Sequence, residues 1–511
     1  MIPSSFDWPR LQNGSDIRGV ALDGVPGEDI NLTPEVMTRF GQAFATWLSQ
    51  SQNHPGNELT IALGRDSRIS GPSLMEAVSK GISSIGCRVI DVGIASTPAM
   101  FMSTLPQTLH CNGAIMLTAS HLPFNRNGLK FFTQEGGLGK KDISAIIEIA
   151  QTNSITTQSA GEITTDPFID TYAQGLVTMI RQGVNHPDNF EQPLQGLKIL
   201  VDAGNGAGGF FASKVLEPLG ADTTGSQFLE PDGTFPNHVP NPEDAEAIAS
   251  LKQAVIKHQA DFGLIFDTDV DRAGAVDGTG RELNRNRLIA LISAILLQEH
   301  PGSTIVTDSI TSDGLTTFIE SDLKGKHHRY IRGYKNVINE AIRLNDNGEE
   351  SWLAIETSGH AALKENYFLD DGAYLVSKIL VELAKSKIAN RTLTDLIANL
   401  IEPKESQEFR LKITTENFKD YGNDVMKQMA DFCQAQPQME IVPNTYEGIR
   451  VRCLQDTEQG WFSLRLSLHD PVLPLNIESN VAGGIQHIIQ RILPFFSEYQ
   501  SLNLTPLHQQ N

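Results

Sequence analysis

Short runs of apolar residues alternate along this chain with longer amphipathic stretches. The runs are nearly continuous in Val, Ile and Leu and end in Gly, Asp or Ser, which is typical of buried strands in an α/β sheet. They cover residues 59–64, 87–93, 112–120, 197–204, 260–267 and 303–309. Stretches with helical periodicity, such as residues 73–86 and 287–300, lie between them. The pattern predicts an α/β protein built from several similar units.

Changes in composition predict three domain boundaries. Residues 152–165 are polar and rich in Thr and Ser, which indicates a linker near residue 160. A second boundary is expected near residue 284, and a third near residue 402, after which alternating strands and helices suggest an α+β unit. At about 150 residues per domain, a chain of 511 residues holds three or four domains. We therefore expect α/β domains over 1–160, 161–284 and 285–402, and a smaller α+β domain over 403–511.

The charge and the cysteines exclude several classes of protein. The chain carries 40 basic and 61 acidic residues, a formal charge of −21, whereas a nucleic-acid surface needs clustered positive charge. The four cysteines form no CxxC pair, so we expect neither a zinc site nor a disulfide framework. No secretory signal is visible, and the longest apolar stretch, residues 288–297, is too short to cross a bilayer. These features predict a cytoplasmic protein with no nucleic-acid or membrane partner, or an organelle-stroma protein if a transit peptide preceded this numbering.

A serine stands at the end of one predicted strand. Thr118-Ala119-Ser120-His121 follows the apolar run, and Lys130 precedes the next strand. Because a serine with an imidazole and an amine close by can be activated, Ser120 is a candidate nucleophile. An ordinary turn is the alternative interpretation of the same residues.

Three aspartates follow another predicted strand. Asp267, Asp269 and Asp271 stand at alternate positions, and Arg272 comes directly after them. Carboxylates this close repel one another, and little except a hard cation offsets that cost. The spacing therefore predicts a Mg²⁺ site at a strand end, with a solvated acidic turn as the alternative.

Two further segments carry polar groups that suit a sugar phosphate. Glu356, Ser358 and His360 follow an apolar strand, and their carboxylate, hydroxyl and imidazole suit a polyol such as a sugar ring. A capped helix start is the alternative. Arg65 and Arg68 flank Asp66, and Arg18 lies in the segment SDIRG. These arginines either hold phosphate or form ion pairs with neighbouring carboxylates.

The glycines of residues 204–209 match the GxGxxG spacing of dinucleotide-binding turns. The segment that would have to form the second strand of such a site, residues 221–236, is rich in turn-forming residues. We therefore interpret the glycines as a tight strand-to-helix turn and not as a nucleotide site.

Taken in this order, the segments resemble the α-D-phosphohexomutase superfamily, nearest to its phosphomannomutase/phosphoglucomutase group. TASH (118–121) with NGLK (127–130) is similar to the phosphoserine loop, DTDVDR (267–272) to the metal loop, and ETSGH (356–360) to the sugar-binding loop. Further similar stretches are residues 231–242, 446–451 and 460–471. The resemblance implies three related α/β domains with mixed sheets and a smaller C-terminal α+β domain around a central cleft.

The resemblance also implies an activity. Such a phosphohexomutase interconverts hexose 1-phosphate and hexose 6-phosphate, of glucose or mannose, through a phosphorylated Ser120 and a hexose 1,6-bisphosphate intermediate that also acts as activator. The implied partners are sugar phosphates and one Mg²⁺ per chain, and no oligomeric state is predicted. Implied catalytic residues are Ser120, His121, Lys130 and Arg272, with His121 or Lys130 as the general acid or base. Implied metal ligands are Ser120, Asp267, Asp269 and Asp271. Implied substrate-binding residues are Arg18, Arg65, Glu356, Ser358, His360, Arg465, Ser467 and His469.

Four positions depart from the family pattern. Leu122 replaces an Asn, Tyr334 and Lys335 stand where a His often follows Gly333, and Ile355 replaces a Gly. In the terminal loop, Arg465 and Ser467 are followed by Leu-His-Asp-Pro (468–471) where the family has Gly-Thr-Glu-Pro. The loss of this glycine and threonine leaves two alternative hypotheses: a phosphotransferase that releases glucose 1,6-bisphosphate, or a catalytically weak regulatory protein that binds sugar phosphates.

Overall fold

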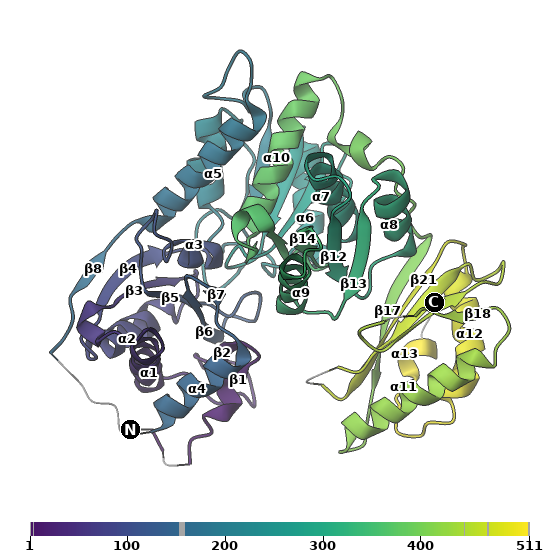
Figure 1. Ribbon diagram of the computed structural model, residues 1–511, viewed down its shortest axis with the longest axis horizontal. Coiled ribbons are helices and arrows are strands. Elements are labelled where there is room, and N and C mark those ends of the chain that lie inside the picture. Colours follow the sequence, from purple (N-terminus) through teal and green to yellow (C-terminus); the bar gives the residue numbers. More distant parts are fainter. Residues whose placement is uncertain (1, 4, 153–158, 444, 468–469, 509–511) are drawn as a thin grey trace. The chain divides into compact units, whose positions relative to one another are not determined.

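The computed structural model describes residues 2–3, 5–152, 159–443, 445–467 and 470–508. The chain forms two compact units, and each unit joins separate stretches of sequence. Unit 1 comprises residues 1–284 and 358–395, and unit 2 comprises residues 285–357 and 396–511. Figure 1 colours the elements of both units along the chain. Among the described residues, no helix is long and apolar enough to span a membrane.

The first sheet of unit 1 is mixed. Its strands run in the order β1-β2-β6-β5-β3-β4-β8, and β7 pairs with β6. The pairs β3–β4, β3–β5 and β4–β8 are parallel, whereas β2–β6 and β5–β6 are antiparallel. The strands are β1 (Gln12–Asn13), β2 (Asp16–Val20), β3 (Thr60–Arg65), β4 (Arg88–Ile94), β5 (Gly113–Leu117), β6 (Arg126–Thr133), β7 (Gly136–Gly137) and β8 (Ile163–Thr165). The helices are α1 (Pro34–Gln52), α2 (Gly71–Ser83), α3 (Thr97–Met102) and α4 (Lys140–Gln151).

Helices α1 and α2 lie side by side against this sheet (Figure 1). Thr33 caps α1 by accepting a hydrogen bond from the backbone N–H of Val36. Two glycines let the helices approach closely, because a Cβ at Gly41 would lie 2.3 Å from the Val78 carbonyl oxygen and one at Gly81 would lie 2.2 Å from that of Thr38. The apolar faces of α1, α2 and α4 join the strands in one core cluster, which holds the sheet rigid beneath the serine that follows β5.

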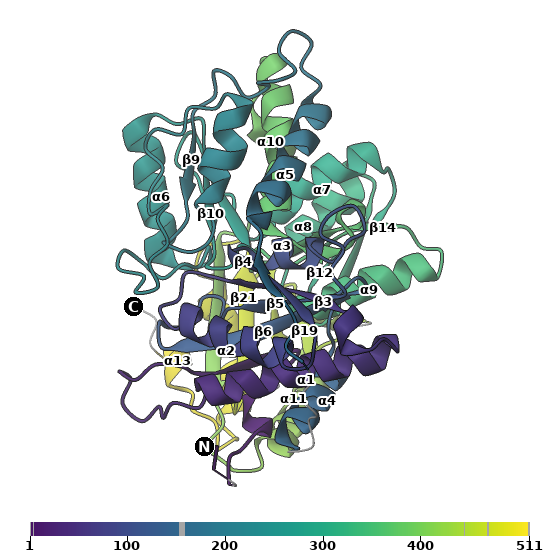
Figure 2. The same cartoon turned by 90° about the vertical axis from the view of Figure 1, so that its left-hand side faces the viewer.

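The second sheet of unit 1 has the order β11-β10-β9. Strand β10 is parallel to β9 and antiparallel to β11, and all five of its residues are buried. The helix α5 lies beside α10, as both views show (Figures 1 and 2). The strands of this sheet are β9 (Ile199–Asp202), β10 (Phe262–Phe266) and β11 (Ala273–Asp277). Unit 1 also contains α5 (Phe168–Val184), a π-helix (Phe211–Leu216), α6 (Ala245–His258), α10 (Gly372–Ile388), and β15 (Ala361–Leu363) and β16 (Leu369–Asp370), which belong to the sheet of β12.

Unit 2 contains the parallel strands of one mixed sheet and a complete antiparallel sheet. The parallel strands run in the order β13-β12-β14. The C-terminal strands run β17-β21-β20-β19-β18, every pair antiparallel, and α11 and α12 share one core cluster with them. The elements are α7 (Asn286–Glu299), β12 (Thr304–Asp308), α8 (Asp313–Thr317), a π-helix (Phe318–Asp322), β13 (Lys326–Tyr330), α9 (Tyr334–Asp346), β14 (Ser351–Ile355), β17 (Glu405–Lys412), α11 (Phe418–Gln434), β18 (Met439–Ile441), β19 (Ile449–Cys453), β20 (Gly460–Leu464), β21 (Val472–Ser479), α12 (Gly484–Phe496) and α13 (Thr505–His508).

The predicted fold class is confirmed: three α/β domains with mixed sheets are followed by a C-terminal domain with its own sheet. Each of the six apolar runs contains a strand, and residues 73–86 and 287–300 overlap α2 and α7. One segment differs from its sequence pattern. Residues 163–165, at the end of the expected linker, form the edge strand β8, which has no buried residue and therefore lacks the apolar pattern of the other strands.

Asp313, at the start of α8, forms ion pairs within unit 2 with arginines of the strands β13 and β19. Arg450 on β19 lies 2.9 Å from it, Arg329 on β13 lies 3.1 Å away, and Arg452 lies 3.4 Å away. Arg450 also donates to the carbonyls of Ser309 and Thr311 and stacks on the Trp461 ring at 3.5 Å. These contacts join the parallel sheet to the antiparallel sheet.

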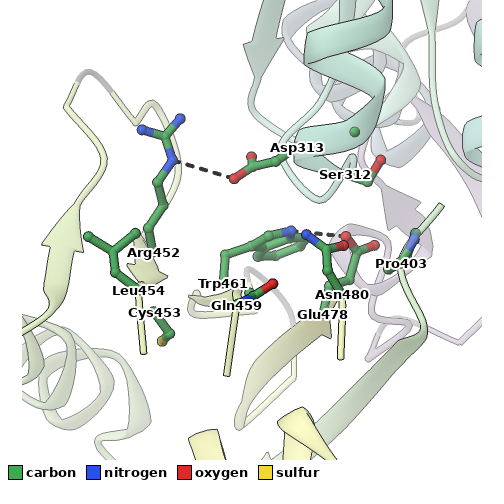
Figure 3. A pocket seen from close by; sticks show the side chains of 12 residues that line it. Ser312, Asp313, Pro403, Arg452, Cys453, Leu454, Gln459, Trp461, Glu478 and Asn480 are labelled. Atoms are coloured by element: carbon green, nitrogen blue, oxygen red, sulfur yellow. Dashed lines mark hydrogen bonds and ion pairs between the residues drawn. The ribbon is translucent and has the colours of Figure 1, made fainter. Parts of the chain in front are cut away.

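A buried glutamate lies next to this junction. Glu478 on β21 accepts a hydrogen bond from the Trp461 indole at 2.9 Å, on the wall of a cavity of about 280 Å³ that Asp313 and Arg452 also line (Figure 3). Burial raises the pKa of Glu478 to about 7, although Arg450 and the Trp461 hydrogen bond lower it. Below about pH 7 the folded protein therefore favours the protonated form of Glu478.

Glu478→Gln should flatten the pH dependence of stability. A raised folded pKa gives a contribution that is present below the unfolded value of 4.5 and is lost as the pH rises through about 7. The wild-type protein should lose about 3 kcal/mol of unfolding free energy over this window, and the variant should not. Chemical denaturation at a series of pH values measures the difference. Glu440→Gln, at an exposed position on β18, is the control, and an equal slope in all three proteins would contradict the assignment.

Candidate active site

Ser120 lies in a turn that follows β5. Its backbone φ is +51°, a left-handed conformation that is uncommon for a residue with a side chain and that clusters at functional sites. The backbone N–H of Ser120 donates to the Thr118 hydroxyl at 2.9 Å. The residue is buried, with 4% of its surface exposed.

Arg68 is hydrogen-bonded to the backbone of the turn that contains Ser120. The residue is fully buried and pairs with Asp66 at 3.1 Å. Its guanidinium donates to the backbone carbonyls of Ser120, Leu122, Pro123 and Arg126. Because all of these acceptors belong to the protein, Arg68 organises the serine turn, in agreement with the ion-pair interpretation of residues 64–68.

The three aspartates follow β10 and are buried. One carboxylate oxygen from each of Asp267, Asp269 and Asp271 lies within 4.8 Å of the others. Val270, between them, has a φ of +66°, which is an outlier for a β-branched residue. The solvated acidic turn is excluded, because these residues are at most 2% exposed.

Cationic side chains and the serine surround the aspartates. Lys130 Nζ donates to Asp269 at 2.9 Å and to Asp271 at 2.5 Å. Arg272 donates from Nε to Asp267 at 3.1 Å and from a terminal nitrogen to Ser120 Oγ at 3.1 Å. Ser120 Oγ in turn lies 3.1 Å from Asp267 Oδ2. The structure thus brings together the predicted nucleophile, the predicted acidic cluster and both predicted cations.

The pKa values reflect burial and mutual repulsion. Burial, Asp271 and Asp269 raise the pKa of Asp267 well above its ordinary value. Burial also favours the neutral form of Asp271, but Lys130, His360 and Arg272 outweigh it and lower the pKa of that carboxyl. Burial and the neighbouring Arg272 lower the pKa of His121 to about 3. His121 Nδ1 therefore acts as an acceptor for Arg272, at 2.5 Å, and also lies 3.3 Å from Ser120 Oγ.

The aspartates fit a divalent cation. Asp269 Oδ1 and Asp271 Oδ1 are buried and make no hydrogen bond within the described part of the chain. Carboxylate oxygens are the ligands that Mg²⁺ prefers, and a buried anionic oxygen without a partner is costly. The donor set of this cluster therefore suits Mg²⁺ or a similar hard cation.

Two neighbours of this cluster were not predicted from the sequence. Thr97, at the start of α3, donates its hydroxyl to Asp269 Oδ2 at 2.5 Å, and its N–H bonds the Asp269 carbonyl at 2.8 Å. Its only signal is the helix-start sequence Ser-Thr-Pro after an apolar run. Asp370 contacts His360 at 2.5 Å. Burial alone would lower the pKa of His360, but Asp370 and then Asp271 raise it to about 9.

The glycines of residues 204–209 lie in a turn after β9, and Gly206 packs against Thr268 in the aspartate loop. A Cβ at Gly206 would lie 2.7 Å from the Thr268 carbonyl oxygen, which also accepts a 2.8 Å bond from the N–H of Ala207. Gly204 has a φ of +52°. The sequence interpretation as a tight turn is confirmed, and close approach to residues 267–272 is its physical reason.

The predicted arginines of unit 1 differ in their surroundings. Arg18 donates to the Ala119 carbonyl at 3.3 Å and pairs with Asp16, so it lies beside the serine turn. Arg65 donates to the Asp66 carbonyl at 3.1 Å. Burial lowers the pKa of Arg65, although Asp66 and Asp91 raise it. In unit 1 the Ser358 hydroxyl is buried without a hydrogen-bond partner among the described residues.

The remaining predicted residues belong to unit 2. Glu356 is buried and accepts a hydrogen bond from the N–H of Gly333 at 2.6 Å. Arg465 directly follows β20 and is 8% exposed, and its Nε makes no described hydrogen bond. Ser467 accepts from the N–H of Asp470 at 3.2 Å. His469 lies outside the described residues.

Carboxylates near Arg465 form a second group that the sequence did not reveal. Glu447 lies 3.9 Å from Arg465 and Glu408 lies 3.8 Å from it. Glu408 also lies 3.7 Å from Arg332, which precedes α9. Because these residues come from separate segments of the chain, their spacing in the sequence does not predict that they lie together.

Asp269→Asn should lower the affinity for Mg²⁺ by at least about tenfold, because an anionic ligand becomes neutral and both the Thr97 and the Lys130 contacts are altered. Titration of the purified protein with Mg²⁺, followed by calorimetry, measures the change. Asp222→Asn makes the same substitution at an exposed position of unit 1 and should leave the titration unchanged. Equal Mg²⁺ affinity in Asp269→Asn and the wild-type protein would refute the metal site.

Comparison with known proteins identifies three matching domain models. They are the α/β/α domains I, II and III of phosphoglucomutase/phosphomannomutase, over residues 9–157, 172–280 and 284–403. A phosphomannomutase/phosphoglucomutase of Pseudomonas syringae pv. tomato is 32% identical over 477 residues, 93% of this chain and 92% of that protein. A phosphoglucomutase of Neisseria gonorrhoeae is 29% identical over 439 residues, 84% of this chain and 87% of that protein.

A solved structure has the same fold. A phosphoglucomutase/phosphomannomutase family protein from Burkholderia thailandensis superposes with a TM-score of 0.76 at 24% identity, covering 98% of each chain. With these matches over most of its length, the chain belongs to the phosphoglucomutase/phosphomannomutase family.

Proposed function

We propose that the protein is a phosphohexomutase that moves a phosphoryl group between the 1- and 6-positions of a hexose by way of Ser120. The observation that carries this proposal is the position of Ser120 Oγ, 3.1 Å from both Arg272 and Asp267 at the edge of the buried aspartates. A hydroxyl placed beside cations and a metal-binding cluster suits phosphoryl transfer, in which charge develops on the transferred oxygens.

The comparisons favour this mutase activity over release of glucose 1,6-bisphosphate as the main product and over a regulatory protein without catalysis. Relatives that align along more than nine-tenths of the chain are phosphomannomutases/phosphoglucomutases, and others are phosphoglucomutases. We accordingly propose glucose and mannose phosphates as substrates, with the hexose 1,6-bisphosphate as intermediate and activator.

One Mg²⁺ per chain is proposed to bind Asp267, Asp269, Asp271 and the phosphorylated Ser120. When bound, the cation neutralises charge on the phosphoryl oxygens. The buried oxygens of Asp269 and Asp271 that accept no hydrogen bond from the described residues support this assignment.

The chain's own side chains divide the remaining tasks. Arg272 orients Ser120 Oγ by a direct hydrogen bond and binds the charge that gathers there. Lys130 Nζ lies against Asp269 and Asp271, so the proton of the attacked sugar hydroxyl is proposed to enter and leave at this nitrogen. His121 Nδ1 is already an acceptor for Arg272, so we assign His121 a role in positioning.

Substrate contacts are proposed for side chains whose polar groups suit a sugar phosphate. The Ser358 hydroxyl, which has no hydrogen-bond partner among the described residues, and the Glu356 carboxylate suit sugar hydroxyls, and the charged His360 suits an anionic oxygen. Arg18, Arg65, Arg465, Ser467 and His469 are proposed for the phosphate groups. We also propose that the four domains span residues 1–160, 161–284, 285–402 and 403–511, and that the protein acts in the cytoplasm.

Ser120→Ala should abolish turnover of glucose 1-phosphate and mannose 1-phosphate, since no hydroxyl remains to carry the phosphoryl group. The melting temperature should change little, because the side chain is one small hydroxyl at a turn. Intact mass spectrometry before and after incubation with glucose 1,6-bisphosphate should find a phosphate adduct in the wild-type protein only.

Ser73→Ala, on the exposed first turn of α2, is the matched control and should keep full activity. Retention of near-normal mutase activity by Ser120→Ala would disprove the phosphoserine mechanism, whatever the mass spectra show.

A further inference from the structure

Three arginines and three carboxylates of unit 2 form a network of ion pairs that includes Arg465. The arginines are Arg332, Arg410 and Arg465, and the carboxylates are Glu408, Glu447 and Asp470. Asp308 adds a further, buried carboxyl group that is close enough to act on Arg332 and Arg465. A phosphate dianion that approaches Arg465 therefore competes with carboxylates that are already paired with this guanidinium.

The two glutamates are held very differently. Glu447 Oε2 accepts short hydrogen bonds from the Ser309 hydroxyl, at 2.7 Å, and from the N–H of Arg332, at 3.1 Å. These two hydrogen bonds fix the Glu447 carboxylate next to the residues that follow β12 and β13. Displacement of Glu447 would break both hydrogen bonds, so this residue is a fixed part of the cluster.

Glu408 is the exchangeable member. It lies 3.7 Å from Arg332 and 3.8 Å from Arg465, distances beyond those of a hydrogen bond. Its described hydrogen bonds come from Asn476, at 3.3 Å, and from the largely exposed Arg410, at 3.2 Å. The Glu408 side chain is 29% exposed and projects from β17, an edge strand of the sheet. A change of rotamer can therefore move its carboxylate into solvent.

The Arg465 guanidinium can bind a stronger hydrogen-bond acceptor than the carboxylates that it contacts in this structure. The residue is 8% exposed, and its Nε makes no hydrogen bond in the described part of the chain. Burial lowers the pKa of Arg465, and Glu447 and Glu408 raise it. Guanidinium groups bind phosphate oxygens by short charge-assisted hydrogen bonds, which are stronger than the long ion pairs seen here.

We propose that Glu408 is a countercharge that sets the affinity of this cluster for the phosphate of the substrate. Glu408 and the phosphate compete for Arg332 and Arg465, so the carboxylate weakens the hold on the dianion. This inference rests on the proposed function, since it takes Arg465 as a phosphate ligand. A mutase has to release one phosphate position and bind the other within a catalytic cycle, and a weakened grip favours that exchange.

Glu408→Gln removes the competing charge and keeps the shape of the side chain. Its dissociation constant for inorganic phosphate, measured by calorimetry, should fall about two- to fivefold, the range expected for partly exposed ion pairs. KM for glucose 1-phosphate should fall by a similar factor while kcat does not rise. A purely structural role would weaken binding and would not tighten it.

Two further variants locate the effect. Glu440→Gln changes the same charge on β18, at the opposite edge of the sheet, and should leave the phosphate affinity unchanged. In an Arg465→Gln background, Glu408→Gln should tighten binding less than in the wild-type background, because only Arg332 remains as a shared partner. If Glu408→Gln fails to fold, Glu408→Asp should show a smaller tightening, since it withdraws the carboxylate by one methylene.

Unchanged or weaker phosphate binding in Glu408→Gln, or equal tightening in Glu440→Gln, would overturn the inference. The phosphate titration needs no turnover, so the two proposals can fail separately. A wild-type protein without mutase activity would refute the proposed function even if Glu408→Gln tightens phosphate binding. If the enzyme is active and Glu408→Gln binds phosphate with the same affinity as the wild-type protein, this inference alone is refuted.

Discussion

The mutual repulsion of Asp267, Asp269 and Asp271 is the constraint around which the site of unit 1 is organised. Three buried carboxylates within 4.8 Å are tolerated only because Lys130, Arg272 and the Thr97 hydroxyl bind them. Those partners come from β6, from the end of the aspartate loop and from α3, so the constraint ties three elements to one point. The same contacts place Ser120 Oγ beside Arg272, and the nucleophile is thus positioned by groups that also balance the charge.

The turns that contain Ser120 and Val270 are strained and are held by hydrogen bonds to their backbone carbonyls. Ser120 and Val270 both have positive φ, and both lie in turns that are fastened at several points. Arg68 bonds four carbonyls of the serine turn, and the N–H of Gly372 bonds the Val270 carbonyl at 3.1 Å. Backbone strain of this kind persists only where surrounding contacts over-determine it.

Much of this arrangement could be predicted from the sequence, because the relevant signals are local. Apolar runs that end in polar residues predicted the strands and the positions of Ser120 and Asp267 at their ends, and the alternate spacing predicted the acidic cluster. What the sequence could not supply depends on long-range pairing. Thr97 lies 172 residues from Asp269, and Glu408 reaches Arg332 and Arg465 through different strands. In the sequence, Thr97 looks like an ordinary residue of a helix start and Glu408 like an ordinary strand residue. Only the folded chain shows their partners.

The central claim is that Ser120 reversibly carries the phosphoryl group under the control of the aspartate cluster. The most direct measurement is a chase experiment with glucose 1,6-bisphosphate labelled with ³²P. In the presence of Mg²⁺, label should enter the peptide that contains Ser120 and should then pass to hexose bisphosphate when unlabelled glucose 1-phosphate is added. Chelation of Mg²⁺ should suppress both steps. Label that enters a different residue, or that stays on Ser120 through the chase, would contradict the account.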